Sequence, residues 1–372
     1  KDVTPSNFVF LIDVSGSMSN GKKLPLLKNA LKLLTQNLRS EDKISIVVYA
    51  GSSGTVLEPT KGDNKNKIYE ALERLESGGS TNGAQGIDLA YKLAKEQFIE
   101  NGNNRVILAT DGDFNVGTTS NDELERLIVE KRETGIYLTT LGFGMGNYKD
   151  DKMELLADKG NGNYFYIDNI MEAKKVLVTE LFGTLYTIAK DVKLQLEFNP
   201  TKVKSYRLIG YENRLLAAQD FSNDSKDAGE LGSGHTVTAL YELIPANSNE
   251  PALGDNVDSL RYQKLELAAV SSSNELVQVK CRYKLLKSET STLKTFYVDD
   301  IANAKSVDFK FASAVAAYGM LLRNSEYIGT TSFNDIYKWA QEGIGEDTHQ
   351  YRSEFLRLVH TAKTLSKLSI AD

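Results

Sequence analysis

Cysteine is almost absent from this sequence. Cys281 is the single cysteine among 372 residues, so an internal disulfide framework and a cysteine-based zinc site are both excluded. It lies in a stretch, Val277 to Leu285, that alternates strictly between apolar and polar residues. Such alternation is typical of a half-buried strand, which predicts Cys281 on the core face and Lys284 on the other.

Long apolar runs and an excess of basic residues are missing as well. No run reaches the roughly 18 apolar residues that cross a bilayer, so no transmembrane segment is predicted. The 44 basic and 50 acidic residues give a net charge of −6, which provides no basic footprint for nucleic acid. The chain begins with Lys1 rather than Met and shows no signal peptide, so we expect a fragment of a longer precursor.

One stretch near the start combines a buried strand with oxygen donors. The apolar residues Phe8 to Ile12 lead directly into Asp13, and Ser15 and Ser17 follow at every second position. A short apolar run bounded by small residues predicts a strand buried on both faces. Because ligands of open α/β sheets bind outside the carboxyl ends of the strands, these donors are expected at a binding edge. A set of oxygens without Cys or His suits Mg, Ca or Mn.

Two further stretches fit the same edge. Gly78 to Gly83 is a glycine-rich loop that carries Thr81 and opens a helix. Arg105 to Ala109 predicts a second buried strand, which Asp111 follows closely. In a parallel sheet both strand ends lie on one edge, so the three loops are expected to meet over a single ion.

With these residues in place, the chain resembles the von Willebrand factor type A domains and their metal-ion-dependent adhesion site. Five residues match that site in order, namely Asp13, Ser15, Ser17, Thr81 and Asp111. The resemblance implies that the hydroxyls bind the cation directly and that the aspartates act partly through water. It implies a divalent cation, with Mg²⁺ preferred and Ca²⁺ or Mn²⁺ as alternatives, whose remaining coordination position takes an Asp or Glu of a partner protein. The alternative interpretation is that these residues are only helix caps and turn residues.

The first half of the chain alternates strands with amphipathic helices. Apolar residues recur at helical spacing from Leu24 to Leu38, and similar spacing predicts a long helix from Met171 to Ala189. The other predicted elements are strands at 43–49, 55–57, 135–141 and 163–167 and helices at 68–75, 84–98, 122–133 and 150–159. This order indicates a doubly wound, mostly parallel α/β sheet, and we place the von Willebrand factor A domain at 7–188.

The second half changes period. Alternating patterns predict an antiparallel β-sandwich over 190–300, with Tyr206, Tyr211 and Tyr241 in its core, and helical spacing returns over 301–372. We expect these C-terminal helices to form a small unit or to pack on the other domains. The stretch from Tyr206 to Arg214 resembles the C-terminal region of bacterial von Willebrand A proteins of the YfbK-like type. That resemblance implies an extracytoplasmic location in the cell envelope and a lipid anchor on the missing N-terminus.

Three catalytic or metal signals are weaker. Gly16 to Lys22 nearly forms a phosphate-binding P-loop, but Lys23 stands where Ser or Thr is needed. The loop from Asp220 to Glu230 is acidic enough for calcium, yet it departs from the EF-hand pattern, and a solvated loop is the preferred interpretation. Asp113 and Asn115 either line the rim of the metal site or cap a turn.

The preferred hypothesis is a metal-dependent protein-binding module for adhesion or assembly, and not an enzyme. Two rival hypotheses remain open. One is a structural component of envelope assembly in which the site is unused, and the other is an enzyme that handles nucleotides or phosphate through the near P-loop.

Overall fold

The computed structural model describes most of the chain in two compact units. The described residues are 4–50, 52–79, 83–112, 121–144, 150–179, 187–211, 215–226, 228–232, 234–253, 273–285, 288–301 and 305–368. The first unit comprises residues 1–193, 224–236 and 283–292, and the second comprises 194–223, 237–282 and 293–372. The domain boundaries proposed from the sequence, 7–188, 190–300 and 301–372, stay predictions.

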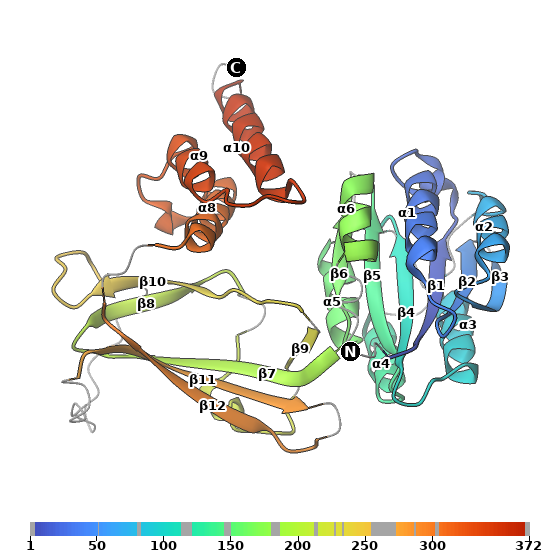
Figure 1. Ribbon diagram of the computed structural model, residues 1–372, viewed down its shortest axis with the longest axis horizontal. Helices are drawn as coiled ribbons and strands as arrows, with labels where there is room; N and C mark the ends of the chain where they lie inside the picture. Colours follow the sequence, from blue (N-terminus) through green and yellow to red (C-terminus); the bar gives the residue numbers. More distant parts are fainter. Residues whose placement is uncertain are drawn as a thin grey trace. The chain divides into compact units, whose positions relative to one another are not determined.

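A six-stranded sheet forms the centre of the first unit (Figure 1). Its strands are β1 (Ser6–Asp13), β2 (Lys43–Ala50), β3 (Ser52–Lys61), β4 (Asn103–Thr110), β5 (Tyr137–Phe143) and β6 (Tyr164–Ile167). They lie in the order β3-β2-β1-β4-β5-β6. All neighbouring pairs run parallel except β2 and β3, which pair antiparallel at one edge. The α/β fold expected from the sequence is therefore confirmed.

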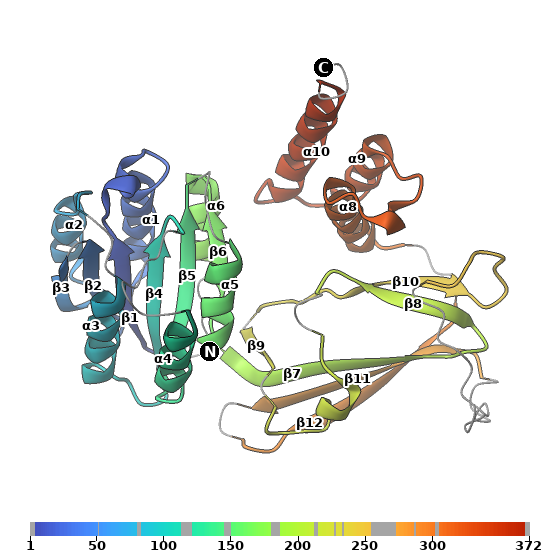
Figure 2. The ribbon, with the colours of Figure 1, turned by 180° about the vertical axis from the view of Figure 1, so that it is seen from behind.

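Helices cover both faces of this sheet (Figures 1 and 2). They are α1 (Leu24–Asn37), α2 (Lys65–Glu73), α3 (Gly83–Glu96), α4 (Asn121–Arg132), α5 (Asp150–Lys159) and α6 (Ile170–Lys174). One buried cluster joins Phe8, Phe10 and Ile12 to α1, α2 and α6, and a second joins Val9 and Leu11 to α3, α4 and α5. Because alternate side chains of β1 enter opposite clusters, all eight of its residues are buried.

The order of the strands places the candidate site. The chain leaves β1 toward β2 on one side and later returns to β4 on the other side of β1. The crevice between the carboxyl ends of two such strands is where open α/β sheets bind ligands. Asp13 ends β1, and Asp111 comes directly after β4, so the two aspartates lie at this switch point.

Two antiparallel sheets follow along the chain. The strands are β7 (Thr187–Phe198), β8 (Val203–Ile209), β9 (Gly229–Gly232), β10 (Leu240–Pro245), β11 (Glu275–Leu285) and β12 (Thr292–Asp299). Strands β10 and β8 form one sheet, and the other has the order β12-β11-β7-β9. In the second unit, Phe198 of β7 packs against Tyr206 of β8, with ring centroids 4.5 Å apart. Aromatic rings thus join strands of the two sheets, as a sandwich requires.

The C-terminal helices build a core of their own. They are α8 (Val307–Leu322), α9 (Phe333–Glu342) and α10 (Tyr351–Leu368), within the range 301–372 where helical spacing was predicted. Helix α9 begins with a capping box between Ser332 and Asp335, in which each side chain satisfies a backbone N–H of the other. The buried side chains of this cluster are Ala314, Ala317, Ile336, Ala340 and Val359.

Some local predictions were wrong. The helix expected over Met171 to Ala189 was placed too far at its C-terminal end, because β7 already begins at Thr187; α6 and a π-helical turn (Lys175–Thr179) account for its first part. The short edge strand expected at 55–57 is the ten-residue β3. Tyr206 and Tyr211 are exposed rather than core residues, and Lys284 is buried although the alternation placed it outside.

Candidate metal centre

The loop after β1 gathers three of the five predicted ligands. Asp13 has no exposed surface, and Ser15 is 3% exposed. The Ser15 backbone N–H donates to Asp13 Oδ1 at 2.9 Å, which fixes one carboxylate oxygen. A single turn of 3-10 helix, Gly16–Ser19, then brings the Ser17 hydroxyl to 3.0 Å from that of Ser15. Two hydroxyls and a buried carboxylate thus converge within five residues.

The fourth predicted ligand arrives from β4. Thr110, the last residue of β4, donates its hydroxyl to Asp13 Oδ2 at 3.0 Å, which ties the end of β4 to the end of β1. Asp111 follows and is 9% exposed. The structure therefore brings Asp13, Ser15, Ser17 and Asp111 together at one edge of the sheet.

The loop that precedes Thr81 meets the same edge. Gly16 N–H donates to Gly79 O at 3.3 Å, and Gly78 N–H donates to Val14 O at 2.7 Å. Gly79 has a φ of +84°, a left-handed conformation that glycine adopts without strain. Thr81 itself lies outside the described residues, as do Asp113 and Asn115. The placement of Thr81 as a ligand stays a prediction.

The side chain of Lys23, the residue after the near P-loop, reaches into this cluster. Lys23 Nζ lies 2.8 Å from Asp111 Oδ2 and donates to Ser17 O at 3.1 Å. Its side chain is 18% exposed, against 5% for that of Asp111. The sequence shows a lysine directly before α1, but its position in the sequence does not indicate which acidic residue it contacts.

Burial dominates the electrostatics of the site. It raises the pKa of the Asp13 carboxyl above the ordinary 3.8, and hydrogen bonds from Ser15 and Thr110 act in the opposite direction. Tyr49 of β2 pairs with Asp13 in the sheet register and is fully buried. Burial, followed by the negative charge of Asp13, raises the pKa of Tyr49 well above 10.0. Tyr49 therefore stays a neutral phenol beside the carboxylate.

The donors present fit a hard divalent cation. Two serine hydroxyls and two carboxylates are oxygen ligands of the kind that Mg²⁺, Mn²⁺ and Ca²⁺ take. Among the described residues no three His, Cys, Asp or Glu side chains cluster as a metal site, so hydroxyls have to supply much of the coordination here. A site built on neutral hydroxyls leaves positive charge on the ion, which a carboxylate from another molecule can neutralise.

Several backbone amides of the near P-loop already have partners within the protein. Gly16 N–H donates to Gly79 O, Met18 N–H to Ser15 O, and Lys23 N–H to Asn20 O. A P-loop needs such amides to point at the ligand. These contacts argue against the nucleotide hypothesis.

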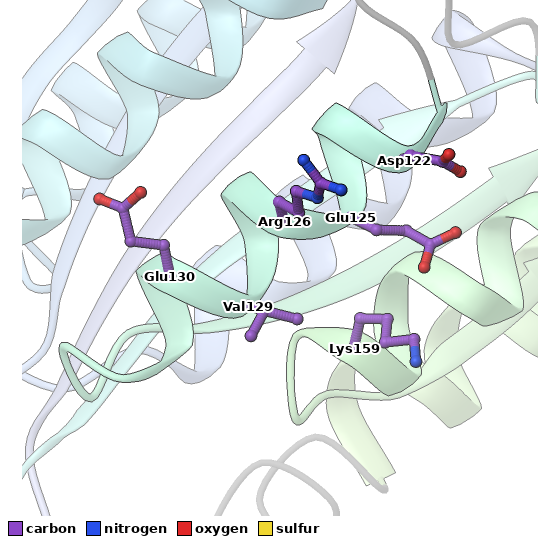
Figure 3. A pocket seen from close by; sticks show the side chains of 6 residues that line it. All are labelled: Asp122, Glu125, Arg126, Val129, Glu130 and Lys159. Atoms are coloured by element: carbon purple, nitrogen blue, oxygen red, sulfur yellow. The ribbon is translucent and has the colours of Figure 1, made fainter.

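Two other places carry charge without resembling a ligand site. A surface groove along α4 and α5 has acidic and basic side chains on its walls, and none belongs to the loops above (Figure 3). The lining residues are Asp122, Glu125, Arg126, Val129, Glu130 and Lys159. In the acidic loop, Lys284 Nζ donates to Asp224 O at 2.6 Å, so a lysine already provides the cation that calcium would bring.

Comparisons with known proteins agree with this architecture. Residues 7–179 match the von Willebrand factor type A domain family, and residues 183–365 match the family described as "Uncharacterized protein YfbK, C-terminal". The sequence is 45% identical to the uncharacterized protein YfbK of Escherichia coli K12 over 99% of this chain and 64% of that protein. It is 30% identical to human inter-alpha-trypsin inhibitor heavy chain H3 over 45% of this chain and 20% of that protein.

A solved structure shares the fold over most of the chain. It is the von Willebrand factor type A protein from Catenulispora acidiphila, 15% identical, with a TM-score of 0.50 over 94% of this chain and 82% of that chain. The two family matches and the 45% identity over 99% of this chain show that it consists of a von Willebrand factor type A domain followed by a C-terminal domain of the YfbK family, and it spans about two thirds of the length of YfbK itself.

Proposed function

We propose that the protein is a metal-dependent protein-binding module. Asp13, Ser15, Ser17 and Asp111, with Thr81, hold a divalent cation, and Mg²⁺ is the preferred ion. A partner protein supplies an Asp or Glu carboxylate to the remaining coordination position. The observation that carries the proposal is the pair of serine hydroxyls 3.0 Å apart beside the fully buried Asp13. Domains of the von Willebrand factor A family often mediate metal-dependent protein interactions, which supports it.

The chemistry of the donors explains why the partner is acidic. Neutral hydroxyl ligands leave the ion with most of its charge, whereas a carboxylate at every position would neutralise it. A partner carboxylate would then gain a strong electrostatic contact with the ion. No histidine lies beside the serine hydroxyls in the described part of this arrangement, and the three histidines, at 235, 349 and 360, belong to other segments. We therefore propose binding rather than catalysis.

A second candidate function has one specific observation in its favour. The ion pair between Lys23 and Asp111 satisfies a predicted ligand without any metal. A structural component of assembly with an unused site would keep such a pair permanently. The two candidates differ in whether capture of a partner depends on a divalent ion.

Calorimetric titration of the chain with MgCl₂, MnCl₂ and CaCl₂ tests the proposal. We expect binding of at least one ion and its loss in Asp13→Ala, since Asp13 is the buried carboxylate of the cluster. Asp158→Ala is the matched control, because Asp158 is an exposed aspartate in the last turn of α5. Binding that persists in Asp13→Ala would place the ion elsewhere.

Partner capture gives the second half of the test. Immobilised protein incubated with an envelope extract should retain a partner in Mg²⁺ and release it in chelator. Retention that is indifferent to chelator would support the structural candidate instead.

The place where the protein acts is also a proposal. None of the helices in the described part of the chain is both long and apolar enough to cross a bilayer. The extracytoplasmic location and lipid anchor that the YfbK-like resemblance implies are checked by cell fractionation and by labelling with a lipid precursor.

A further inference from the structure

Lys23 occupies a prepared position in the candidate metal centre. It lies directly before α1, where its backbone N–H donates to Asn20 O. Its aliphatic stem passes over Gly144, which follows β5, and a Cβ at residue 144 would lie 2.3 Å from Lys23 Cε and 3.1 Å from Cγ. The side chain of Lys23 therefore packs directly on the backbone of Gly144, and a side chain at that position would displace it.

The ammonium group of Lys23 contacts two oxygens of the candidate metal centre. Lys23 Nζ lies 2.8 Å from Asp111 Oδ2 and 3.1 Å from Ser17 O, so both contacts involve residues of the proposed ligand set. A lysine ammonium is a compact charge, and at these distances it neutralises the Asp111 carboxylate. A divalent ion that uses Asp111, directly or through a water, would place a second cation within a few ångströms of Nζ. Like charges at that separation repel strongly where water is scarce.

We propose that Lys23 is a built-in competitor of the divalent cation. Without metal, the lysine pairs with Asp111 and keeps the buried carboxylates compensated. Binding of the ion requires Nζ to leave Asp111, so the affinity of the site is lower than its oxygen ligands alone would give. The centre then has two states: one in which the Lys23 ammonium pairs with Asp111, and one in which a divalent ion from solution replaces it. This inference rests on the proposed metal site and adds the regulation of its occupancy.

The test compares two neighbouring lysines by calorimetry with MgCl₂ and MnCl₂. Lys23→Met keeps the approximate length of the side chain and removes its charge. We expect the dissociation constant for the metal ion to be roughly tenfold lower, about the factor that removal of one partly screened charge repulsion provides. Lys22→Met is the matched control, because Lys22 is exposed and the same charge is removed one residue away. Its affinity should equal that of the unmodified chain.

A second measurement needs no metal. In chelator, Lys23→Met should lower the Tm, because Asp111 loses its counter-charge, whereas in an Asp111→Asn background the same substitution should lower the Tm much less, because only the hydrogen bond to Ser17 O is then lost. Equal effects in both backgrounds would overturn the pairing of Lys23 with Asp111.

The outcomes separate this inference from the proposed function. Metal affinity that is equal or weaker in Lys23→Met overturns the competition and leaves the metal site standing. Tighter metal binding combined with partner capture that ignores chelator supports the competition and overturns the proposed function. If neither protein binds any ion, both fall.

Discussion

The side chain of Asp13 shows how a single residue of the site is held. It is fully buried, and its two oxygens accept from different segments of the chain, Oδ1 from the Ser15 backbone in the loop after β1 and Oδ2 from the Thr110 hydroxyl at the end of β4. Hydrogen bonds that orient a ligand in this way set both its direction and its basicity. We infer that Thr110 positions Asp13 in the candidate metal centre.

Thr110→Val tests that role. Valine matches the shape of threonine and removes the donor to Asp13, so we expect metal affinity to fall by roughly 10- to 100-fold, the usual effect of losing an orienting partner. Thr140→Val is the control, since Thr140 is a fully buried threonine of β5 whose hydroxyl donates to Met153 O. It should cost about 1–3 kcal/mol of unfolding free energy in urea while metal affinity stays unchanged. Equal metal affinity in both variants would refute the positioning role.

Sequence alone proposed the candidate ligands but not the residues that contact them. Asp13, Ser15, Ser17 and Asp111 were identifiable because their order and spacing form a pattern. Thr110 and Lys23 were not, because a hydroxyl at a strand end and a lysine before a helix are ordinary residues. Their roles depend on which side chain they face across β1 and β4, and that depends on the register of the folded sheet.

Strand β11 shows where apolar–polar alternation fails to predict which side chains are buried. Its alternation predicted Lys284 on the outer face, yet Lys284 is 6% exposed and Leu285 next to it is 57% exposed. The reason is a polar cluster in the first unit: Lys284 Nζ lies 2.8 Å from Asp191 Oδ2. A buried ion pair outweighs the apolar preference at that point, and such a pair is invisible to periodicity.

Lys284→Met should be costly for this reason. Removing one partner of a buried pair leaves an uncompensated charge, and we expect a loss of about 3 kcal/mol in unfolding free energy, measured in urea. Adding Asp191→Asn should recover most of it, because the amide oxygen still accepts from Ala228 N–H as Asp191 Oδ1 does. A double variant as unstable as Lys284→Met alone would show that the charge is not the cause.

The same pair predicts a dependence on alkaline pH. The hydrogen bond to Asp191 raises the pKa of Lys284 above its ordinary 10.5. The folded state therefore holds this proton more tightly than the unfolded chain does. The contribution of the pair is fully present below pH 10.5 and is lost as the pH rises through the raised pKa. Lys284→Met should lose less stability over that interval, as followed by urea unfolding.

The hydrophobic clusters of the whole molecule predict that the N-terminal α/β domain folds independently. Both large hydrophobic clusters of the sheet draw all their buried members from residues between Phe8 and Leu177. A fragment of residues 4–179 should therefore fold without the rest and retain its metal affinity. Circular dichroism and calorimetry on that fragment check it, and a product without a cooperative thermal transition would contradict it.

For the whole molecule, the sequence predicted the order of strands and helices better than the residues at which they begin and end. Alternating strands and helices identified the doubly wound sheet, because each element buries its own face against the next. The transition after α6 was misplaced, because apolar residues at 173, 176, 177, 181 and 185 continue a helical spacing almost to Thr187, where β7 begins. Strand alternation becomes visible only from Val192 onward.

The parallel contact between β1 and β4 has a mechanical consequence. Asp13 and Thr110 touch although 97 residues separate them. An ion shared by Asp13 and Asp111 would close a loop of about that length, and closing a long loop restricts the unfolded chain in the manner of a disulfide. In a chain with one cysteine, which cannot form an internal disulfide, the ion would act as a reversible cross-link. How long the domain survives a pulling force or a protease would then follow the ion concentration of its surroundings.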